Sequence, residues 1–154
     1  MLSREEQKIK NKLFWEDFRK FMGKVKSSNG RKMNWLNYPS DVKDIYIRLQ
    51  VDSKSAKLCF DIQSRDVGIR SIIWEQMTEL KKIMEVTMNC SGEWNEQIYN
   101  SEGVSISQIK WEKEGLNFYN ENHKLEIFEF FKEKLVAFDL FYQEFKEIII
   151  NLAH

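Results

Sequence analysis

The stretch IYIRLQVDSKSAKLCFDIQ, residues 45–63, consists of two runs in which apolar and polar side chains alternate, joined by the polar segment 52–55. A period of two is typical of a β-hairpin that buries one face and exposes the other. The apolar face carries Ile45, Ile47, Leu49, Val51, Ala56, Leu58, Phe60 and Ile62. The other face carries Tyr46, Arg48, Gln50, Lys57, Cys59, Asp61 and Gln63. This second face aligns polar groups on a rigid element and is therefore a candidate binding surface.

The chain before the hairpin predicts one helix and one short strand. Apolar residues recur at helical spacing over residues 4–26, after Ser3 and Glu6, which have the spacing of a capping box. A strand is expected at residues 33–38, where the chain then reaches its only proline.

After the hairpin, the sequence predicts a second helix and a second hairpin. The helix is expected over residues 67–88, with Asp66 as its N-cap. Two strands are expected at residues 93–99 and 104–111. The apolar phase slips between Ile106 and Ile109, which predicts a β-bulge there, and residues 116–119 are expected to add a short strand.

A long apolar stripe predicts that the rest of the chain, from the N-cap Asn122 onward, is one helix. A straight helix of this length spans about 45 Å. A compact domain of this size is only about 38 Å across. We therefore expect the helix to break, to protrude or to pack on another molecule, and we predict a homodimer through it, because two-fold dimers are the commonest oligomers.

The order of elements is thus helix, three strands, helix, two or three strands and a long C-terminal helix. This order predicts a single α+β domain over residues 1–154, with a mainly antiparallel sheet packed by helices.

Composition narrows the class of protein. With 42% hydrophobic residues among 154, the chain can form a real core. Its 24 basic and 24 acidic side chains cancel, whereas a protein made mainly to bind nucleic acid usually has a basic excess. Two cysteines are too few for a disulfide framework. No secretory or membrane-spanning pattern is present, so we expect a cytoplasmic protein without a membrane partner.

Six short segments along the chain form an ordered set, namely Phe14-Trp15, Gly30-Arg31-Lys32, Asn34-Trp35, Tyr46-Ile47-Arg48-Leu49, Phe60-Asp61-Ile62-Gln63 and Phe130-Phe131. Taken in this order, they resemble a family of bacterial proteins known as domain of unknown function 4268. The resemblance covers nearly the whole chain and supplies no established catalytic residues. Some relatives look like C-terminal partners of nuclease-like domains in restriction-associated proteins, which implies a link to nucleic-acid or defence systems. Relatives often carry Glu in place of Asp61.

A basic segment extends from Phe18 to Ser40 and contains no acidic residue. Its six cations are Arg19, Lys20, Lys24, Lys26, Arg31 and Lys32. Interleaved aromatic residues would suit phosphate contacts combined with base stacking. In the alternative interpretation, the aromatic residues belong to the core and the cations form a solvated face.

We therefore predict a non-enzymatic interaction or accessory domain without a cofactor, with nucleic acid or an acidic protein as its partner. Its candidate binding residues are Arg31, Lys32, Trp35, Tyr46, Arg48, Asp61 and Gln63. Arg48 would supply a planar donor, and Asp61 and Gln63 would supply acceptors.

The alternative is a divergent nuclease of the PD-(D/E)xK type. In that fold two carboxylates hold Mg²⁺ while a lysine assists the attacking water. Asp44 and Asp61 would be the carboxylates, and Glu16 or Glu75 could add a ligand. Gln63 stands where the lysine is expected, which argues against catalysis. Without a metal role, Asp61 would pair with Arg48 across the sheet.

Overall fold

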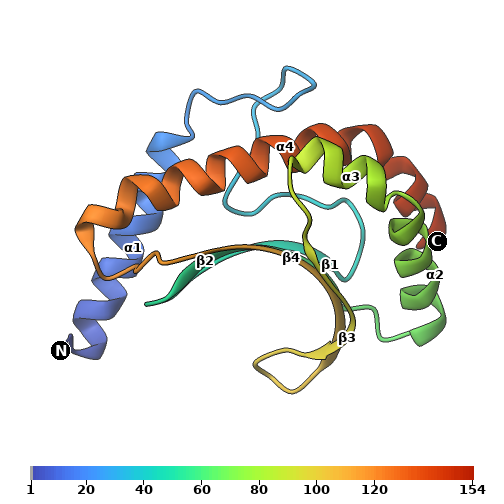
Figure 1. Ribbon diagram of the computed structural model, residues 1–154, viewed down its shortest axis with the longest axis horizontal. Helices are drawn as coiled ribbons and strands as arrows, with labels where there is room; N and C mark the ends of the chain where they lie inside the picture. The colour runs from blue at the N-terminus through green and yellow to red at the C-terminus, as the bar shows by residue number, and fades with distance from the viewer. Residues whose placement is uncertain (1) are drawn as a thin grey trace.

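The centre of the protein is one antiparallel sheet in the order β1-β2-β4-β3, in a computed structural model that describes residues 2–154 (Figure 1). The strands are β1 (Ile45–Val51), β2 (Ser55–Ile62), β3 (Glu93–Tyr99) and β4 (Ser105–Glu114). The helices are α1 (Arg4–Phe21), α2 (Val67–Glu79), α3 (Lys81–Met88), the short 3₁₀ helix η1 (Glu121–His123) and α4 (Lys124–Leu152). The predicted α+β class is confirmed.

The first hairpin has the predicted register. Ile45 lies opposite Ile62, and the pairing continues without interruption to Val51 and Ala56. The apolar face is the core face, because Leu58 and Phe60 are both 0% exposed.

The sheet is strongly curved, and its two faces differ in what covers them. Figure 1 shows α4 running along the convex face, with α1 at one end of the molecule and α2 and α3 at the other. Among the described residues, no helix covers the concave face.

The chain between α1 and β1 differs from the prediction. α1 ends at Phe21, and Gly23 turns the chain by donating to the carbonyl of Lys20. The strand expected at residues 33–38 is wrong, since this segment is a loop of turns. Its side chains Trp35 and Tyr38 are buried by packing in the tertiary core, and this burial mimics a strand pattern in the sequence.

The predicted second helix is two helices, because the chain bends at Leu80. The N–H of Leu80 donates to the carbonyls of Gln76 and Met77, which closes the last turn of α2. Figure 1 shows α2 and α3 meeting at a sharp angle. The bend buries Met77 and Met84 on both helices, which one straight helix could not place against the curved core. Asp66 caps α2 as predicted.

The second hairpin carries its bulge on β3 rather than on β4. The register shifts between Asn95 and Ile98, while the pairing on β4 advances only from Gln108 to Ile106. The apolar phase of β4 changes because Ile106 lies on the opposite face of the strand from Ile109. The strand expected at residues 116–119 is wrong, since these residues form a loop.

α4 is one continuous helix of 29 residues and follows the long axis of the molecule (Figure 1). It is preceded by η1, which is capped by Asn120 rather than starting at Asn122. Residues from Ile127 to Ile149 are buried along it, so the helix neither breaks nor protrudes. The length argument for a dimer through α4 therefore disappears, although the dimer itself stays a prediction. No helix in the described part of the chain has the length and apolarity needed to cross a membrane.

Candidate binding surfaces

The concave face of the sheet forms an open polar surface, which we call the trough. Strand register places Tyr46 opposite Asp61 and Arg48 opposite Cys59. The same face continues onto β4, where Gln108 lies opposite Asp61. The remaining trough residues are Gln50, Lys57, Lys110 and Glu112. The structure thus brings three of the predicted binding residues together on one surface.

Arg48 and Tyr46 form a stacked pair in the trough. The Arg48 Cζ atom lies 4.7 Å from the centre of the Tyr46 ring, and Tyr46 is 41% exposed. A guanidinium over an aromatic face is attracted by the ring quadrupole. The expected ion pair between Arg48 and Asp61 does not form within the described residues.

Asp61 is a buried carboxylate with few hydrogen-bond donors. Its side chain is 3% exposed, and its Oδ1 accepts a hydrogen bond of 2.9 Å from Gln108 Nε2. Burial raises the pKa of Asp61 above its ordinary value, against the lowering effects of Gln108 and Arg48. No described residue donates a hydrogen bond to the other carboxylate oxygen, Asp61 Oδ2. This oxygen is not fully buried, so it reaches the trough surface.

Asp139 on α4 shows what a fully satisfied buried carboxylate looks like in the same protein. It is 1% exposed and accepts hydrogen bonds from four residues. The donors are Ser27 Oγ at 3.0 Å, the Ser28 N–H at 2.7 Å, Tyr38 Oη at 2.6 Å and Gln143 Nε2 at 3.2 Å. Asp139 is not among the residues predicted from the sequence. The sequence signal for a buried acid was its position: Asp139 directly follows Phe138 within the apolar stripe of the last helix.

The other end of the trough is an ion-pair network with little net charge. Lys110 Nζ lies 3.0 Å from Glu93 and 3.5 Å from Glu112, and Lys57 Nζ lies 3.8 Å from Glu112. These pairs cancel locally, so the trough does not attract a polyanion as a whole. Burial raises the pKa of the Cys59 thiol to about 12, so this thiol is not ionised at neutral pH.

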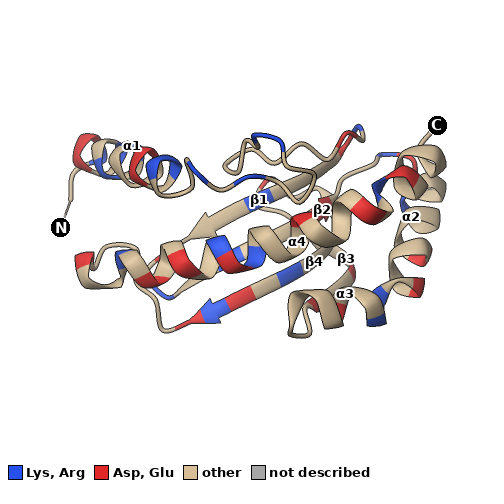
Figure 2. Ribbon diagram, turned by 90° about the horizontal axis from the view of Figure 1, so that it is seen from above, with Lys and Arg blue, Asp and Glu red and all other residues tan. Residues whose placement is uncertain are grey.

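The basic segment lies on the opposite side of the sheet from the trough. Figure 1 shows the loop after α1 on the convex side of the sheet, where α4 also lies, and Figure 2 shows this loop beside α4, near β1. Hydrogen bonds from Ser27 and Ser28 to Asp139 attach it to α4. Arg31 and Lys32 therefore do not share a surface with Tyr46 and Arg48.

The aromatic residues of the basic segment are not available for stacking. Trp35 is 3% exposed, and its indole N–H donates to the Val25 carbonyl at 2.9 Å. Tyr38 is bound to Asp139, and Phe21 is half-buried in the core. The core interpretation holds for these side chains, whereas the six cations face solvent.

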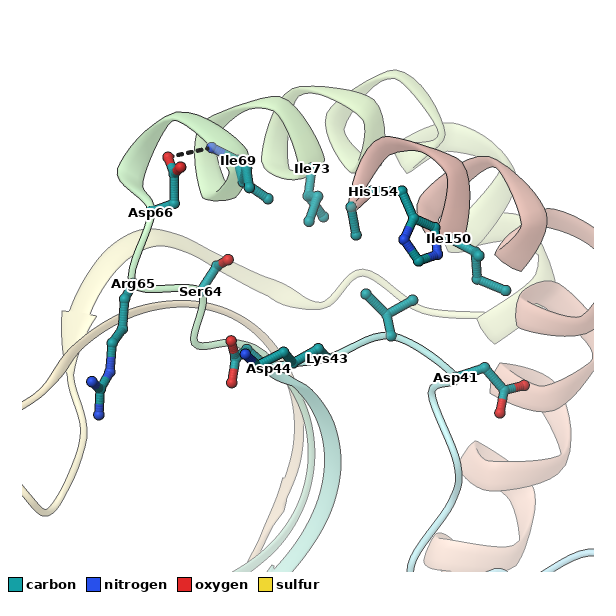
Figure 3. A pocket seen from close by; sticks show the side chains of 12 residues that line it. Asp41, Lys43, Asp44, Ser64, Arg65, Asp66, Ile69, Ile73, Ile150 and His154 are labelled. Atoms are coloured by element: carbon teal, nitrogen blue, oxygen red, sulfur yellow. Dashed lines mark hydrogen bonds between the residues drawn. The ribbon is translucent and has the colours of Figure 1, made fainter.

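Asp44 lines a pocket of about 700 Å³ between α2, the C-terminal end of α4 and the loop before β1, and Asp61 is not among the residues that line this pocket (Figure 3). Gln63 is half-buried beside it, and its N–H donates to the Asp44 carbonyl at 2.7 Å. Asp66 caps α2 through Gly68 and Ile69.

The acidic side chains of this pocket do not converge on one point. Asp41 pairs with Lys146 at 3.1 Å, and Figure 3 shows Asp41 and Asp66 at opposite ends of the pocket. Glu16 belongs to α1 and Glu75 to α2, and these two helices lie at opposite ends of the molecule (Figure 1). Over residues 2–154, no group of three or more His, Cys, Asp or Glu side chains is placed to hold a metal ion.

Comparison with known proteins places the chain in a family. No curated protein and no solved structure matches it. The family model described as domain of unknown function (DUF4268) matches residues 11–146, which is most of the chain. The protein therefore belongs to the DUF4268 family.

Proposed function

We propose that this protein is a cytoplasmic accessory domain that contacts nucleic acid through its basic segment and catalyses no reaction. The observation that carries the proposal is the state of the six cations of that segment. All six are exposed, and none forms an ion pair with a described residue.

Outside the segment, only part of the positive charge is free. Seven of the fourteen lysines there have ion-pair partners, and they lie on the sheet and on α1 and α4, namely Lys10, Lys57, Lys110, Lys113, Lys124, Lys134 and Lys146. The segment differs from the rest of the chain because it holds six cations and no acidic residue. Although the formal net charge is zero, the basic segment concentrates uncompensated positive charge on one side. Neutralising phosphates with such cations releases counterions and gives sequence-independent binding.

No cofactor is needed for this role. The aromatic side chains described in the basic segment are buried or half-buried, which favours phosphate contact over base stacking there. Gln63 cannot replace the lysine of the nuclease motif in stabilising charge. The nuclease alternative therefore gains no support from the placement of Asp44 and Asp61.

The test is fluorescence anisotropy of labelled single- and double-stranded DNA, with and without Mg²⁺, over a salt series. We expect binding whose logarithmic affinity falls with a slope of about −0.9 per phosphate neutralised on duplex DNA. The Arg31→Glu/Lys32→Glu variant should lose this binding. The matched control Lys54→Glu/Lys82→Glu makes the same charge change at two other exposed positions and should retain most of it. Equal losses in the two variants, or no binding at low salt, would reject the proposal.

A second candidate function is ligand binding in the trough. The observation that favours it is the contrast between Asp61, whose Oδ2 has no donor among the described residues, and the saturated Asp139. A ligand that donates to Asp61 and lies against the Tyr46–Arg48 pair would complete the site. If Arg48→Ala abolishes DNA binding while Arg31→Glu/Lys32→Glu does not, the trough is the binding surface. Mg²⁺-dependent degradation of the DNA would instead restore the nuclease alternative.

A further inference from the structure

β1 is an edge strand whose outer side has free backbone groups. The Asp44 carbonyl accepts from the Gln63 N–H, and the Asp52 N–H donates to the Ser55 carbonyl. Even-numbered residues of β1 therefore bond toward β2, because the direction of backbone groups alternates along a strand. The N–H and C=O groups of Ile45, Ile47, Leu49 and Val51 consequently point away from the sheet.

The outward N–H and C=O groups of Ile45 already have hydrogen-bond partners within the chain. The Ile45 N–H donates to the Val42 carbonyl at 3.3 Å, and the Ile45 carbonyl accepts from Ser40 Oγ at 2.7 Å. This leaves Ile47, Leu49 and Val51, whose outward groups have no hydrogen-bond partner among the described residues. A groove of about 790 Å³, lined by residues 36–40 and 42–50, follows this edge.

The two edges of the sheet are protected differently. β3 has a register shift at residues 95–98 and exposed acidic side chains, both of which discourage pairing with another strand. β1 pairs with β2 over seven consecutive residues without a bulge or a proline. An unprotected edge of this kind is a template for an added strand.

We infer that β1 pairs antiparallel with β1 of a second copy of this chain, about a two-fold axis through Leu49. In this register, Ile47 lies opposite the partner's Val51, and Leu49 lies opposite the partner's Leu49. These three residues have the free outward groups. Arg48 lies opposite the partner's Gln50, so a guanidinium meets an amide oxygen that can accept its hydrogen bond.

Other registers are less favourable for identifiable reasons. An axis through Arg48 places two guanidinium groups directly opposite each other, which is destabilising. An axis through Ile47 requires the backbone groups of Ile45, which are already bonded. An axis through Gln50 pairs Ile47 with Ser53, which lies beyond the end of β1.

The geometry of the groove agrees with the Leu49 axis. Beyond Ile47, the partner's chain continues into its turn at residues 52–55, which then lies beside Ile45 and the loop at residues 36–40. The half-buried side chains of Leu49 and Val51 gain cover from their counterparts on the same face. A two-fold axis perpendicular to the sheet keeps both basic segments on one side of the dimer.

The test combines mass measurement with site-specific cross-linking. Multi-angle light scattering at tens of micromolar should give about twice the monomer mass of 18.6 kDa. In a Cys59→Ala/Cys90→Ser background, which also removes the thiol opposite residue 48, Arg48→Cys/Gln50→Cys should form a disulfide-linked dimer on mild oxidation, because facing non-hydrogen-bonded positions come within disulfide range. Each single cysteine variant should remain largely uncross-linked, because neither residue then lies opposite itself.

Three results would overturn this inference. One is a monomer mass together with no cross-link in the double variant. Another is efficient cross-linking of Arg48→Cys alone, which would indicate the Arg48 axis. The third is loss of the dimer in Leu140→Lys, a change at an exposed position of α4, with retention in Leu49→Pro, which removes an outward-pointing N–H and a half-buried side chain from the edge strand. Circular dichroism should show that both variants are folded.

Discussion

The hydroxyl of Tyr38 donates a hydrogen bond of 2.6 Å to Asp139 Oδ1, and the two residues are 101 positions apart in the chain. This bond joins the loop before β1 to the middle of α4. Ser27 and Ser28 donate to the same carboxylate, so one acidic side chain orders most of the basic segment. The four cations of that segment that follow α1 therefore project from a loop with a defined anchor.

Asp139→Asn should destabilise the protein by about 2–4 kcal/mol, because an amide replaces one acceptor oxygen with a donor facing other donors. The free energy of unfolding from urea denaturation measures this change. Glu144→Gln, at an exposed position of the same helix, is the control and should stay within about 0.5 kcal/mol. A loss below about 1 kcal/mol for Asp139→Asn would contradict the anchoring role.

Asp61→Asn should have the opposite effect at neutral pH. Burial raises the pKa of Asp61 in the folded state, so ionisation favours unfolding as the pH rises above the ordinary value of 3.8. The amide removes this penalty and can still accept from Gln108. The melting temperature of Asp61→Asn should therefore exceed that of the wild type at pH 7, and the difference should vanish near pH 3. A difference that grows on acidification would show that the sign is wrong.

Tyr142→Phe should cost about 1–2 kcal/mol, since it leaves the Ser40 carbonyl without its hydroxyl donor. Tyr142 Oη lies 2.6 Å from that carbonyl, and Ser40 in turn bonds the start of β1. Chemical denaturation gives the free-energy change. Tyr119→Phe, whose ring is 46% exposed, is the matched control and should be nearly neutral. Equal effects at the two positions would indicate that the Ser40 contact contributes nothing.

Gly92→Ala should destabilise the protein by about 1–3 kcal/mol through overpacking. A Cβ at this position would lie 3.0 Å from Cε2 and Nε1 of Trp111 and 3.1 Å from Ile109 Cγ2. Both neighbours are buried core side chains with little room to move. Tryptophan fluorescence during denaturation reports the change, with the exposed Ser91→Ala as control. Unchanged stability would mean that β3 and β4 shift to admit the methyl group.

The sequence predicted elements that are specified locally and failed where tertiary contacts decide. The period of two over residues 45–63 specified the first hairpin and its buried face. The loop at residues 33–38 looked like a strand because Trp35 and Tyr38 are apolar and closely spaced. Their burial depends on α4, which lies about a hundred positions away in the chain. The bend at Leu80 likewise follows from the curvature of the core rather than from a glycine or proline.

The candidate surfaces were predictable in part for the same reason. Alternation identifies the side chains of the trough, including Tyr46, Arg48 and Asp61. It cannot reveal that Gln108 is the donor to Asp61, because that pairing depends on the position of β4 in the sheet. Nor can it reveal that the basic segment lies on the other face of the sheet, since only the three-dimensional path of the loop decides this.

The path of α4 also has a kinetic consequence. Polar contacts connect the first forty-one residues to the region 121–146. The pairs are Lys10 with Glu121, Asp17 with Lys124, Ser27 and Tyr38 with Asp139, Ser40 with Tyr142, and Asp41 with Lys146. Sequence separations of this size raise the contact order, and a high contact order slows folding. The first forty residues can complete their native contacts only after α4 has been synthesised, so until then this part of a nascent chain exposes Phe14, Phe18 and Trp35 to solvent and to chaperones.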